Sequence, residues 1–308
     1  MAIVVIGAVF VDVKGYPNSA YIPKGRNAGR VEQTFGGVSR NVAEDIANLE
    51  LRPTFVSIVD NSPTGEAVIA QLNRHKVDTE YMRKVKNGNG TWLAIFNETG
   101  DVEASISKRP DLSPILDILE EKGDEIFKDA DSICLEIDMD SDIVNKIFEL
   151  ADKHHKKVYA LVSNMSIAMK RRDLIQKTSC FVCNLQEASK FFSDDLEPLE
   201  PIQLEDILVR NIKAANIESM VVTMGEKGSV YATKDGIKGY VPAGKVDVVD
   251  TTGAGDSFFA GVAAGLTYGK SLEESCKIAT RIASSVITTT EAVCPRFMPE
   301  EFGFERRD

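Results

Sequence analysis

Two carboxylates and two glycines fall within one octet, Asp250-Thr251-Thr252-Gly253-Ala254-Gly255-Asp256-Ser257. An extended run, Val246 to Val249, precedes the octet, and small apolar residues with helical spacing and no proline follow it. The pattern predicts a strand, a tight glycine turn and a buried helix. The first turn of a helix carries unpaired N–H groups and the positive end of the dipole. Gly253, Ala254 and Gly255 therefore predict an anion site, usually one for phosphate.

Asp250 and Asp256 flank this predicted anion site. A carboxylate beside a phosphate is unfavourable unless it handles a proton or a cation, so Asp256 is a candidate general base. A simpler alternative is a glycine turn in which Asp250 caps the helix and Asp256 interacts with its dipole. Because so many constrained positions coincide in one octet, we favour the functional interpretation.

A second group of candidate ligand-binding residues lies near the start of the chain. Gly36 and Gly37 open a helical pattern, where paired glycines let a ligand approach the backbone, and Asn41 lies one turn further on. Asp12 ends the first buried strand, and a carboxylate there is a good acceptor for two hydroxyl groups. The alternatives are an ordinary glycine turn and an exposed loop acid.

Two further segments follow predicted strands. In Asn184-Leu185-Gln186-Glu187, an amide and a carboxylate one helical turn apart can share a water-coordinated Mg²⁺, form a capping box, or do both. Thr223-Met224-Gly225-Glu226-Lys227-Gly228 contains two glycines but lacks the Gly-Lys-Ser/Thr ending of a Walker A loop.

The octet resembles the C-terminal signature of the ribokinase-like carbohydrate kinases, the PfkB family, which reads Asp-Thr-x-Gly-Ala-Gly-Asp. Residues 36–41 are similar to the N-terminal signature of that family, Gly-Gly-x-x-x-Asn, and weaker matches run from Gly7 to Glu291. The resemblance implies that Asp256 is the catalytic base and that the amides of Gly253, Ala254 and Gly255 form the anion hole.

The resemblance also implies the remaining site residues. Those implied for the acceptor are Asp12, Gly36, Gly37 and Asn41. Those implied for the nucleotide are Asn184, Thr223, Gly225 and Gly228, with weaker matches at Thr280, Ser284 and 288–292. The implied cofactors are ATP and Mg²⁺, the latter held through water by Asn184 and Glu187, with K⁺ as a candidate monovalent cation near Asp250 and Thr252. Glu291 stands where the family usually has glycine, which argues against the potassium site.

Composition limits the class of protein. The 308 residues carry a net charge of −11, which disfavours a nucleic-acid partner. No apolar run is long enough for a membrane span, and the first residues read as a buried strand without signal-peptide features. The five cysteines, most of them in apolar segments, predict reduced thiols and therefore a cytoplasmic protein. Cys180 and Cys183 lie in a predicted buried strand, and the three histidines are expected at the surface, so no zinc site is expected.

Buried strands alternate with helical patterns along the chain. The expected strands are Ile3–Val9, Thr54–Val59, Ser132–Ile137, Lys157–Val162, Ser179–Cys183 and Ser219–Thr223. The expected helices are Val38–Leu49, Gly65–His75, Ser141–His154, Leu185–Phe192, Leu204–Ala215 and a last one from Ser271 toward Thr288, and 194–206 is expected to be a loop. This order predicts an α/β fold with a doubly wound, mostly parallel sheet.

Residues 13–35 and 86–107 interrupt that alternation, and the second stretch has hairpin patterning. The resemblance implies one ribokinase-like domain over 1–308, with these two insertions forming a small β lid over the sugar. It also implies a homodimer that pairs through the lid.

The acceptor is the least constrained prediction. Residues 29–44 are most similar to pseudouridine kinases, so pseudouridine is the first expectation, with ribose or fructose as the alternative. Lys108 and Arg109 replace an acidic pair expected in that subgroup, and they would suit either a solvated turn or a phosphorylated substrate. Two other classes of protein are disfavoured. A non-catalytic sugar or nucleotide sensor should have lost Asp256 or an anion-hole glycine, and none of these is lost. A Rossmann dehydrogenase needs a Gly-x-Gly-x-x-Gly turn after the first strand, and this turn is lacking.

Overall fold

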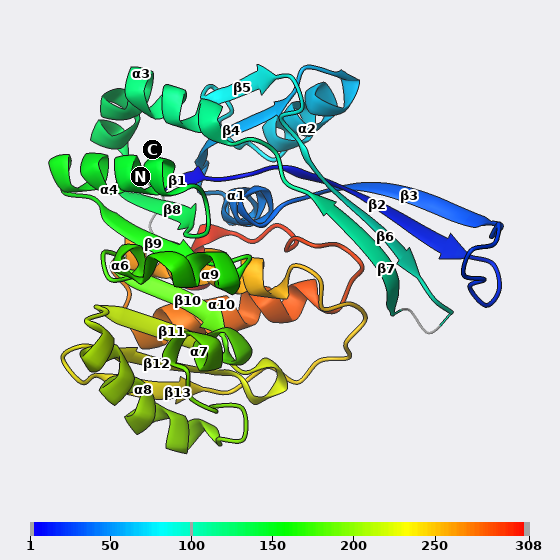
Figure 1. Cartoon of the computed structure of the whole chain (residues 1–308). Coiled ribbons are helices and arrows are strands. Elements are labelled where there is room, and N and C mark those ends of the chain that lie inside the picture. The colour runs from blue at the N-terminus through cyan, green and yellow to red at the C-terminus, as the bar shows by residue number, and fades with distance from the viewer. Residues whose placement is uncertain (1–2, 99–100, 305–308) are drawn as a thin grey trace.

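The computed structural model describes residues 3–98 and 101–304, and its centre is a nine-stranded sheet (Figure 1). The strands of this sheet are β1 (Ile3–Ile6), β4 (Thr54–Asp60), β5 (Met82–Val85), β8 (Ser132–Glu136), β9 (Lys157–Leu161), β10 (Cys180–Asn184), β11 (Ser219–Thr223), β12 (Ser229–Thr233) and β13 (Lys238–Val241). Their order is β13-β12-β11-β10-β9-β8-β1-β4-β5. The strands from β11 to β5 pair in parallel, whereas β12 and β13 form an antiparallel edge. The predicted doubly wound, mostly parallel sheet is confirmed.

Helices cover both faces of this sheet and create two hydrophobic cores. The helices on one face are α1 (Val38–Asn48), α2 (Pro63–Arg74), α9 (Ala254–Thr267) and α10 (Leu272–Val286). Those on the other face are α3 (Ser113–Asp129), α4 (Ser141–Lys153), α5 (Met165–Ala168), α6 (Arg172–Ile175), α7 (Leu185–Phe192) and α8 (Pro201–Ala215). In β1, Val4 and Ile6 belong to one core and Ile3 and Val5 to the other, because successive side chains of a strand point to opposite faces.

A second sheet of four strands extends away from the large one (Figure 1), and we call it the lid sheet. Its strands are β2 (Phe10–Pro17), β3 (Gly29–Gly36), β6 (Gly90–Phe96) and β7 (Val102–Lys108), in the order β3-β2-β6-β7. Both predicted insertions contribute to it, and the chain enters it directly from β1. Tyr16 stacks on Phe96 at 4.9 Å between ring centroids, which stiffens one face of the lid sheet.

Some expectations about individual elements were wrong. Residues 246–249 form no strand, and Val246, Val248 and Val249 are exposed. The expected loop at 194–206 already contains the start of α8 at Pro201. Three short 3₁₀ helices complete the described elements: η1 (Met169–Arg171), η2 (Gly225–Lys227) and η3 (Pro299–Phe302). No helix in residues 3–98 or 101–304 is long and apolar enough to cross a membrane.

Candidate active site

The glycine turn of the octet leads into α9 as predicted. Gly253 has a φ of 80°, and a Cβ there would lie 1.9 Å from the carbonyl oxygen of Ala292, so both conformation and space require glycine. A Cβ at Gly255 would meet nothing within 4 Å, so this residue faces open space. The N–H groups of Gly255 and Asp256 have no acceptor among the described residues, whereas those of Ala254 and Ser257 bond to carbonyls of the turn. The start of α9 therefore presents free donors to an anion.

A cavity of about 910 Å³ opens in front of this helix start. The lining residues that sequence analysis had assigned to the nucleotide are Thr223, Gly225, Gly228, Thr280 and Ser284. Ala254 and Gly255 line the same cavity, so the structure brings the expected nucleotide residues and the anion turn together. Val246 and Val248, from the run that was expected to be a strand, also line this cavity.

Asp256 meets a residue from the other signature. The Asn41 side chain, on α1, donates from Nδ2 to Asp256 Oδ2 at 2.7 Å, although the two residues are 215 positions apart. Asn41 is buried and Asp256 is half-buried. The two predicted turns therefore converge on one place, with the base candidate held by an amide from the acceptor side.

Asp12, Gly36 and Gly37, which were predicted to bind the acceptor, form one tight corner. A Cβ at Gly36 would lie 2.4 Å from Oδ2 of Asp12, so the missing side chain makes room for that carboxylate. Gly37, just before α1, has a φ of 101°, and a Cβ there would lie 2.8 Å from the carbonyl oxygen of Ala8. Both glycines are thus needed to bring β2 and the start of α1 together beside Asp12.

Burial shifts the acid–base behaviour of these carboxyls. Burial raises the pKa of Asp256 to about 6, while the hydrogen bond from Asn41 and the charge of Arg40 hold it down. The pKa of Asp12 is also raised, chiefly by burial, and is opposed by the charges of Lys14 and Arg40. A base whose pKa lies just below neutral pH is ionised in the cell and still accepts a proton readily.

Sequence analysis missed a group of buried acids at the end of β8. Glu136 Oε1 accepts hydrogen bonds from the backbone N–H of Ser39 at 3.0 Å and from its hydroxyl at 2.6 Å. Burial raises the pKa of Glu136 to about 7, and repulsion from Asp138 adds to the shift. Only the chain order hinted at this site, because carboxyl ends of parallel strands carry ligand sites in such sheets.

Asp138 lies next to this acid and ties three segments together. Its carboxylate accepts from the Ser163 backbone at 2.9 Å and hydroxyl at 2.8 Å, and it forms an ion pair with Arg109 at 2.7 Å. A cavity of about 170 Å³ lies here, between Phe10 of the lid sheet and Glu136. The charge of Arg109, which follows β7, is therefore already neutralised by a buried partner.

Asn184 and Glu187 form the capping box that starts α7. Asn184 Oδ1 accepts from the Glu187 backbone at 2.8 Å, and Glu187 Oε2 accepts from the Asn184 backbone at 2.8 Å. Neither residue lines the 910 Å³ cavity. Burial raises the pKa of Glu187, the hydrogen bond from the Asn184 backbone opposes the rise, and repulsion from Asp138 adds to it. One carboxylate oxygen of Glu187 is not engaged in the capping box.

Asp250 and Thr252 adopt a local turn, in which Asp250 Oδ1 accepts from the Thr252 backbone at 2.8 Å. This bond closes a turn before α9 and does not cap the helix, since Gly253 is the N-cap residue and α9 has no side-chain cap. In the described part of the chain, no group of three or more His, Cys, Asp or Glu side chains is arranged to hold a metal ion.

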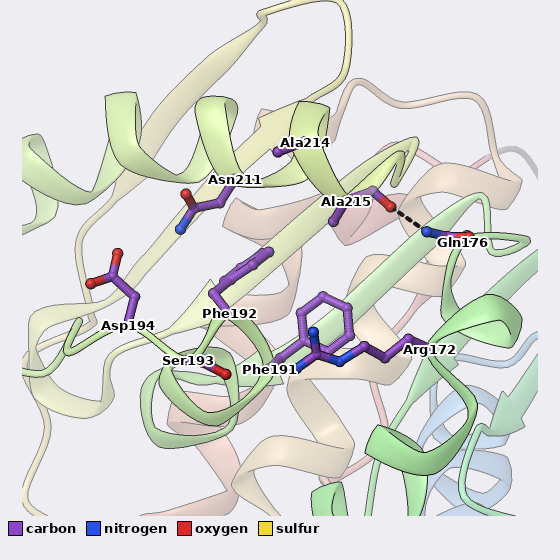
Figure 2. Close-up of a pocket in the computed structure, with 9 residues that line it drawn as sticks. All are labelled: Arg172, Gln176, Phe191, Phe192, Ser193, Asp194, Asn211, Ala214 and Ala215. Carbon is purple, nitrogen blue, oxygen red and sulfur yellow. Dashed lines mark hydrogen bonds between the residues drawn. The ribbon is translucent and has the colours of Figure 1, made fainter.

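A further cavity, of about 410 Å³, lies apart from these residues, between α6, α7 and α8 (Figure 2). Figure 2 shows Phe192 and Asn211 reaching toward it, with Arg172 beneath the ring of Phe191. None of the predicted site residues lines it.

Comparison with known proteins identifies the family. Residues 2–296 match the model of the pfkB family of carbohydrate kinases. The chain belongs to this family. The pfkB chain is 31% identical to a guanosine-inosine kinase from Exiguobacterium acetylicum over 94% of its own length and 95% of the relative. It is 24% identical to a pseudouridine kinase from Escherichia coli strain K12, over 93% and 90% of the two chains.

Solved structures confirm the fold of the pfkB chain. An Arabidopsis thaliana ribokinase, determined with ribose and ATP, superposes with a TM-score of 0.83 over 98% of this chain and 99% of that one, at 21% identity. The predicted ribokinase-like fold and the predicted kinase family are both confirmed. The protein is thus a phosphotransferase that acts on a hydroxyl group of a sugar or nucleoside.

Proposed function

We propose that this enzyme transfers the γ-phosphoryl group of ATP to the hydroxymethyl group of a nucleoside. The observation that carries the proposal is the contact between Asn41 and Asp256 beside the free amides of α9. This contact supports Asp256 as the base, because it links Asp256 at the helix start suited to phosphate with Asn41 on the side of the corner suited to hydroxyl groups. These are the parts that phosphoryl transfer needs, because its catalysis depends on positioning and on charge stabilisation.

In the proposed mechanism each residue has one role. Asp12, assisted by the backbone at Gly36 and Gly37, holds the ring hydroxyls of the acceptor. Asp256 accepts the proton of the attacking hydroxyl as the bond to phosphorus forms. The N–H groups of Gly255 and Asp256 stabilise the negative charge that develops on the phosphoryl oxygens. The nucleotide lies in the 910 Å³ cavity, against Thr223, Gly225 and Gly228.

We further propose that Mg²⁺ accompanies ATP through water held by Glu187 and Asn184. Mg²⁺ keeps several of its waters and binds substrate phosphates with one or two carboxylates, so a protein cage is not required. The raised pKa of Glu187 beside Asp138 fits a nearby cation. Bound Mg²⁺ would neutralise charge on the phosphates. A monovalent cation, K⁺, near Asp250 and Thr252 is a weaker proposal, since the Asp250 carboxylate already accepts from the Thr252 backbone.

Among nucleosides, the comparisons favour guanosine or inosine over pseudouridine, because the guanosine-inosine kinase is the more similar of the two relatives. Ribose and fructose remain the alternative acceptors. A substrate that already carries phosphate is disfavoured, because the charge of Arg109 is paired with Asp138, which leaves Lys108 as the cation of this pair for a phosphate.

One panel tests these proposals. Guanosine, inosine, pseudouridine, ribose and fructose would be incubated with ATP and Mg²⁺, and both ADP and the phosphorylated product measured. We expect a nucleoside to have a kcat/KM at least about tenfold above the free sugars, a difference of roughly 1.4 kcal/mol. Higher values for ribose or fructose would reject the nucleoside. Binding of every acceptor without turnover would instead favour the non-catalytic sensor. Full activity in excess chelator would reject the proposed Mg²⁺.

We also propose that the chain forms a single kinase domain and is located in the cytoplasm. We further propose that two copies pair through the outer face of the lid sheet. Leu93 of β6 is opposite Ile106 of β7, and Val31 of β3 lies on the same face. These three side chains are 41%, 68% and 73% exposed, which is unusual for neighbouring apolar residues of a monomer. Light scattering should find a dimer that Ile106→Lys dissociates, whereas the control Ile202→Lys, at an exposed position on α8, should not. A monomeric wild type would reject the pairing.

A further inference from the structure

We infer that Arg40 is a positioning residue for the base. It fixes the orientation of the Asn41 amide and stabilises the ionised form of Asp256. Arg40 is on α1 and only 3% exposed. Its guanidinium forms an ion pair with Glu44, one helical turn away, and donates to Asn41 Oδ1. The inference rests on the proposed function, because it assumes that Asp256 is the base.

Arg40 determines which way the amide of Asn41 faces. An Asn side chain has one accepting oxygen and one donating nitrogen, and its two orientations are nearly equal in shape. A guanidinium can only donate, so Arg40 requires the oxygen of Asn41 on its side. The nitrogen must then face Asp256, where it donates to Oδ2 at 2.7 Å. This bond occupies one carboxylate oxygen and leaves Asp256 Oδ1 for the acceptor hydroxyl.

Arg40 also offsets negative charge around Asp256. Two other carboxyls interact repulsively with Asp256: Asp45, also on α1, and Glu136, at the end of β8. Burial likewise disfavours the ionised form of Asp256. Arg40 is the cation that opposes these effects, and it also stabilises the charge of Asp12. One guanidinium therefore supports both the proposed base and the proposed acceptor ligand.

Stability alone does not explain a buried arginine at this position. Replacing buried ion pairs by apolar side chains is often neutral or stabilising, so such a pair is weak support for a purely structural role. The Nε–H of Arg40 is buried and has no acceptor within the described residues, a further cost. Glu44 has other partners, since it accepts from Gln71 at 3.2 Å and lies 3.1 Å from His75 Nε2. The donation to Asn41 is the contact that links Arg40 to the site.

The test compares three variants with the wild type. Arg40→Gln/Glu44→Gln removes both charges of the ion pair, so that Glu44 is not left as a buried carboxylate without its partner. Glu44→Gln is the matched control, because it breaks the ion pair and keeps the guanidinium beside Asn41. Arg40→Lys keeps the charge but loses the planar fork that reaches two partners at once. Each variant would be assayed for kcat and kcat/KM from pH 5 to 9, and for thermal unfolding.

For the double variant we expect the acid limb of kcat/KM to move upward by about one pH unit. Its kcat at pH 7 should fall about 10–100-fold, because the base is misoriented, and should recover in part at higher pH. Glu44→Gln should lower the melting temperature and leave the acid limb in place. Arg40→Lys should also keep the acid limb but lose kcat. A folded double variant with wild-type kcat and acid limb would overturn the inference.

Two further outcomes keep the test decisive. If the double variant does not fold, Arg40→Lys decides: wild-type kcat in that variant overturns the orienting role. If the wild type phosphorylates no acceptor on the panel, the proposed function fails and the role of Arg40 is read without turnover. In that case the Asp256 carboxyl would be titrated by ¹³C NMR in the wild type and the double variant. Its signal would be assigned as the one that is missing from Asp256→Asn. An equal pKa in both would reject the charge-holding role.

Discussion

Asp256 carries the chemistry of the proposed reaction, and its environment suits that role. Its carboxylate is partly buried, is held at one oxygen by Asn41, and directly follows the free amides at the start of α9. A structural role would make Asp256 only a first-turn partner of the helix dipole, worth about 0.3–1 kcal/mol. The two roles differ in what substitution does to turnover.

We predict that Asp256→Asn lowers kcat by roughly 10²–10⁴, because the amide keeps the shape but cannot accept the proton. ATP affinity and the melting temperature should change little. Both kcat and melting temperature would be measured on one preparation. A variant with near-normal kcat and slightly lower stability would show that Asp256 serves the helix and not the reaction.

The pH dependence of turnover should report the same carboxyl. Since the pKa of Asp256 is raised to about 6, the base is ionised above this value and protonated below it. We therefore predict that kcat/KM for the acceptor falls as the pH decreases through about 6, at saturating ATP. An acid limb near pH 4, the range of an ordinary aspartate, would contradict the assignment.

At the scale of elements, the site depends on where helices begin. The starts of α1 and α9 both follow glycines with positive φ, Gly37 and Gly253, and the two helices pack against each other on one face of the sheet. The acceptor corner and the anion turn meet because these two helix starts meet.

The two glycines of the anion turn give a matched pair of variants. Gly255→Ala places a methyl group in open space in the nucleotide cavity, so we predict unchanged unfolding but weaker ATP binding and lower kcat. In Gly253→Ala, the alanine would have to adopt a positive φ, and its Cβ would lie 1.9 Å from the carbonyl oxygen of Ala292. This variant should therefore also lower the free energy of unfolding, by about 1–3 kcal/mol. Melting temperature and steady-state kinetics distinguish the two. Equal losses of stability in both variants would contradict the geometry.

The sequence predicted most elements and both turns of the site, and its failures have physical causes. Helix α3 was not expected, because Gly123 lies in its middle and glycine weakens a helical pattern. The structure explains the glycine: a Cβ there would lie 2.4 Å from a methyl carbon of Leu150 on α4. Tertiary packing thus selected a residue that local propensity disfavours.

The site shows the same limit. Asp12, Asn41 and Asp256 were recognisable because short motifs surround them. Glu136 was not, because its partner is distant in the sequence. Arg40 lies within the 36–41 motif, but its inferred role depends on its burial and on the contact between Asn41 and Asp256. The contact between Glu136 and Ser39 spans 97 positions, and no local pattern announces it.

At the scale of the whole molecule, three carboxyls, two of them buried and one partly buried, influence stability. Burial is the main cause that raises the pKa of Asp45 and of Glu136 to about 7, and of Asp256 to about 6. In the unfolded chain these groups titrate near pH 4. Between the two ranges the folded protein binds more protons than the unfolded chain, so the free energy of unfolding decreases as pH rises.

We predict that the free energy of unfolding is greater at pH 5.5 than at pH 8, by on the order of 2 kcal/mol. Urea unfolding at both pH values measures this difference. Glu136→Gln is the control, because both bonds from Ser39 go to one oxygen that glutamine retains. The variant should show a smaller pH dependence. Equal stability at the two pH values in the wild type would contradict the raised pKa values.

The C-terminal segment is fastened to α1, an element from the first fifth of the chain. The Cys294 N–H donates to Asp45 at 2.6 Å, Asn48 donates to the Cys294 carbonyl at 2.6 Å, and the Phe297 N–H donates to the Asn48 carbonyl at 2.8 Å. On the ribosome, at about 5–20 residues per second, α1 emerges tens of seconds before these partners exist. Until residue 297 has left the exit tunnel, the nascent chain lacks these three hydrogen bonds. We therefore expect α1 to gain its C-terminal partners only when translation is almost complete.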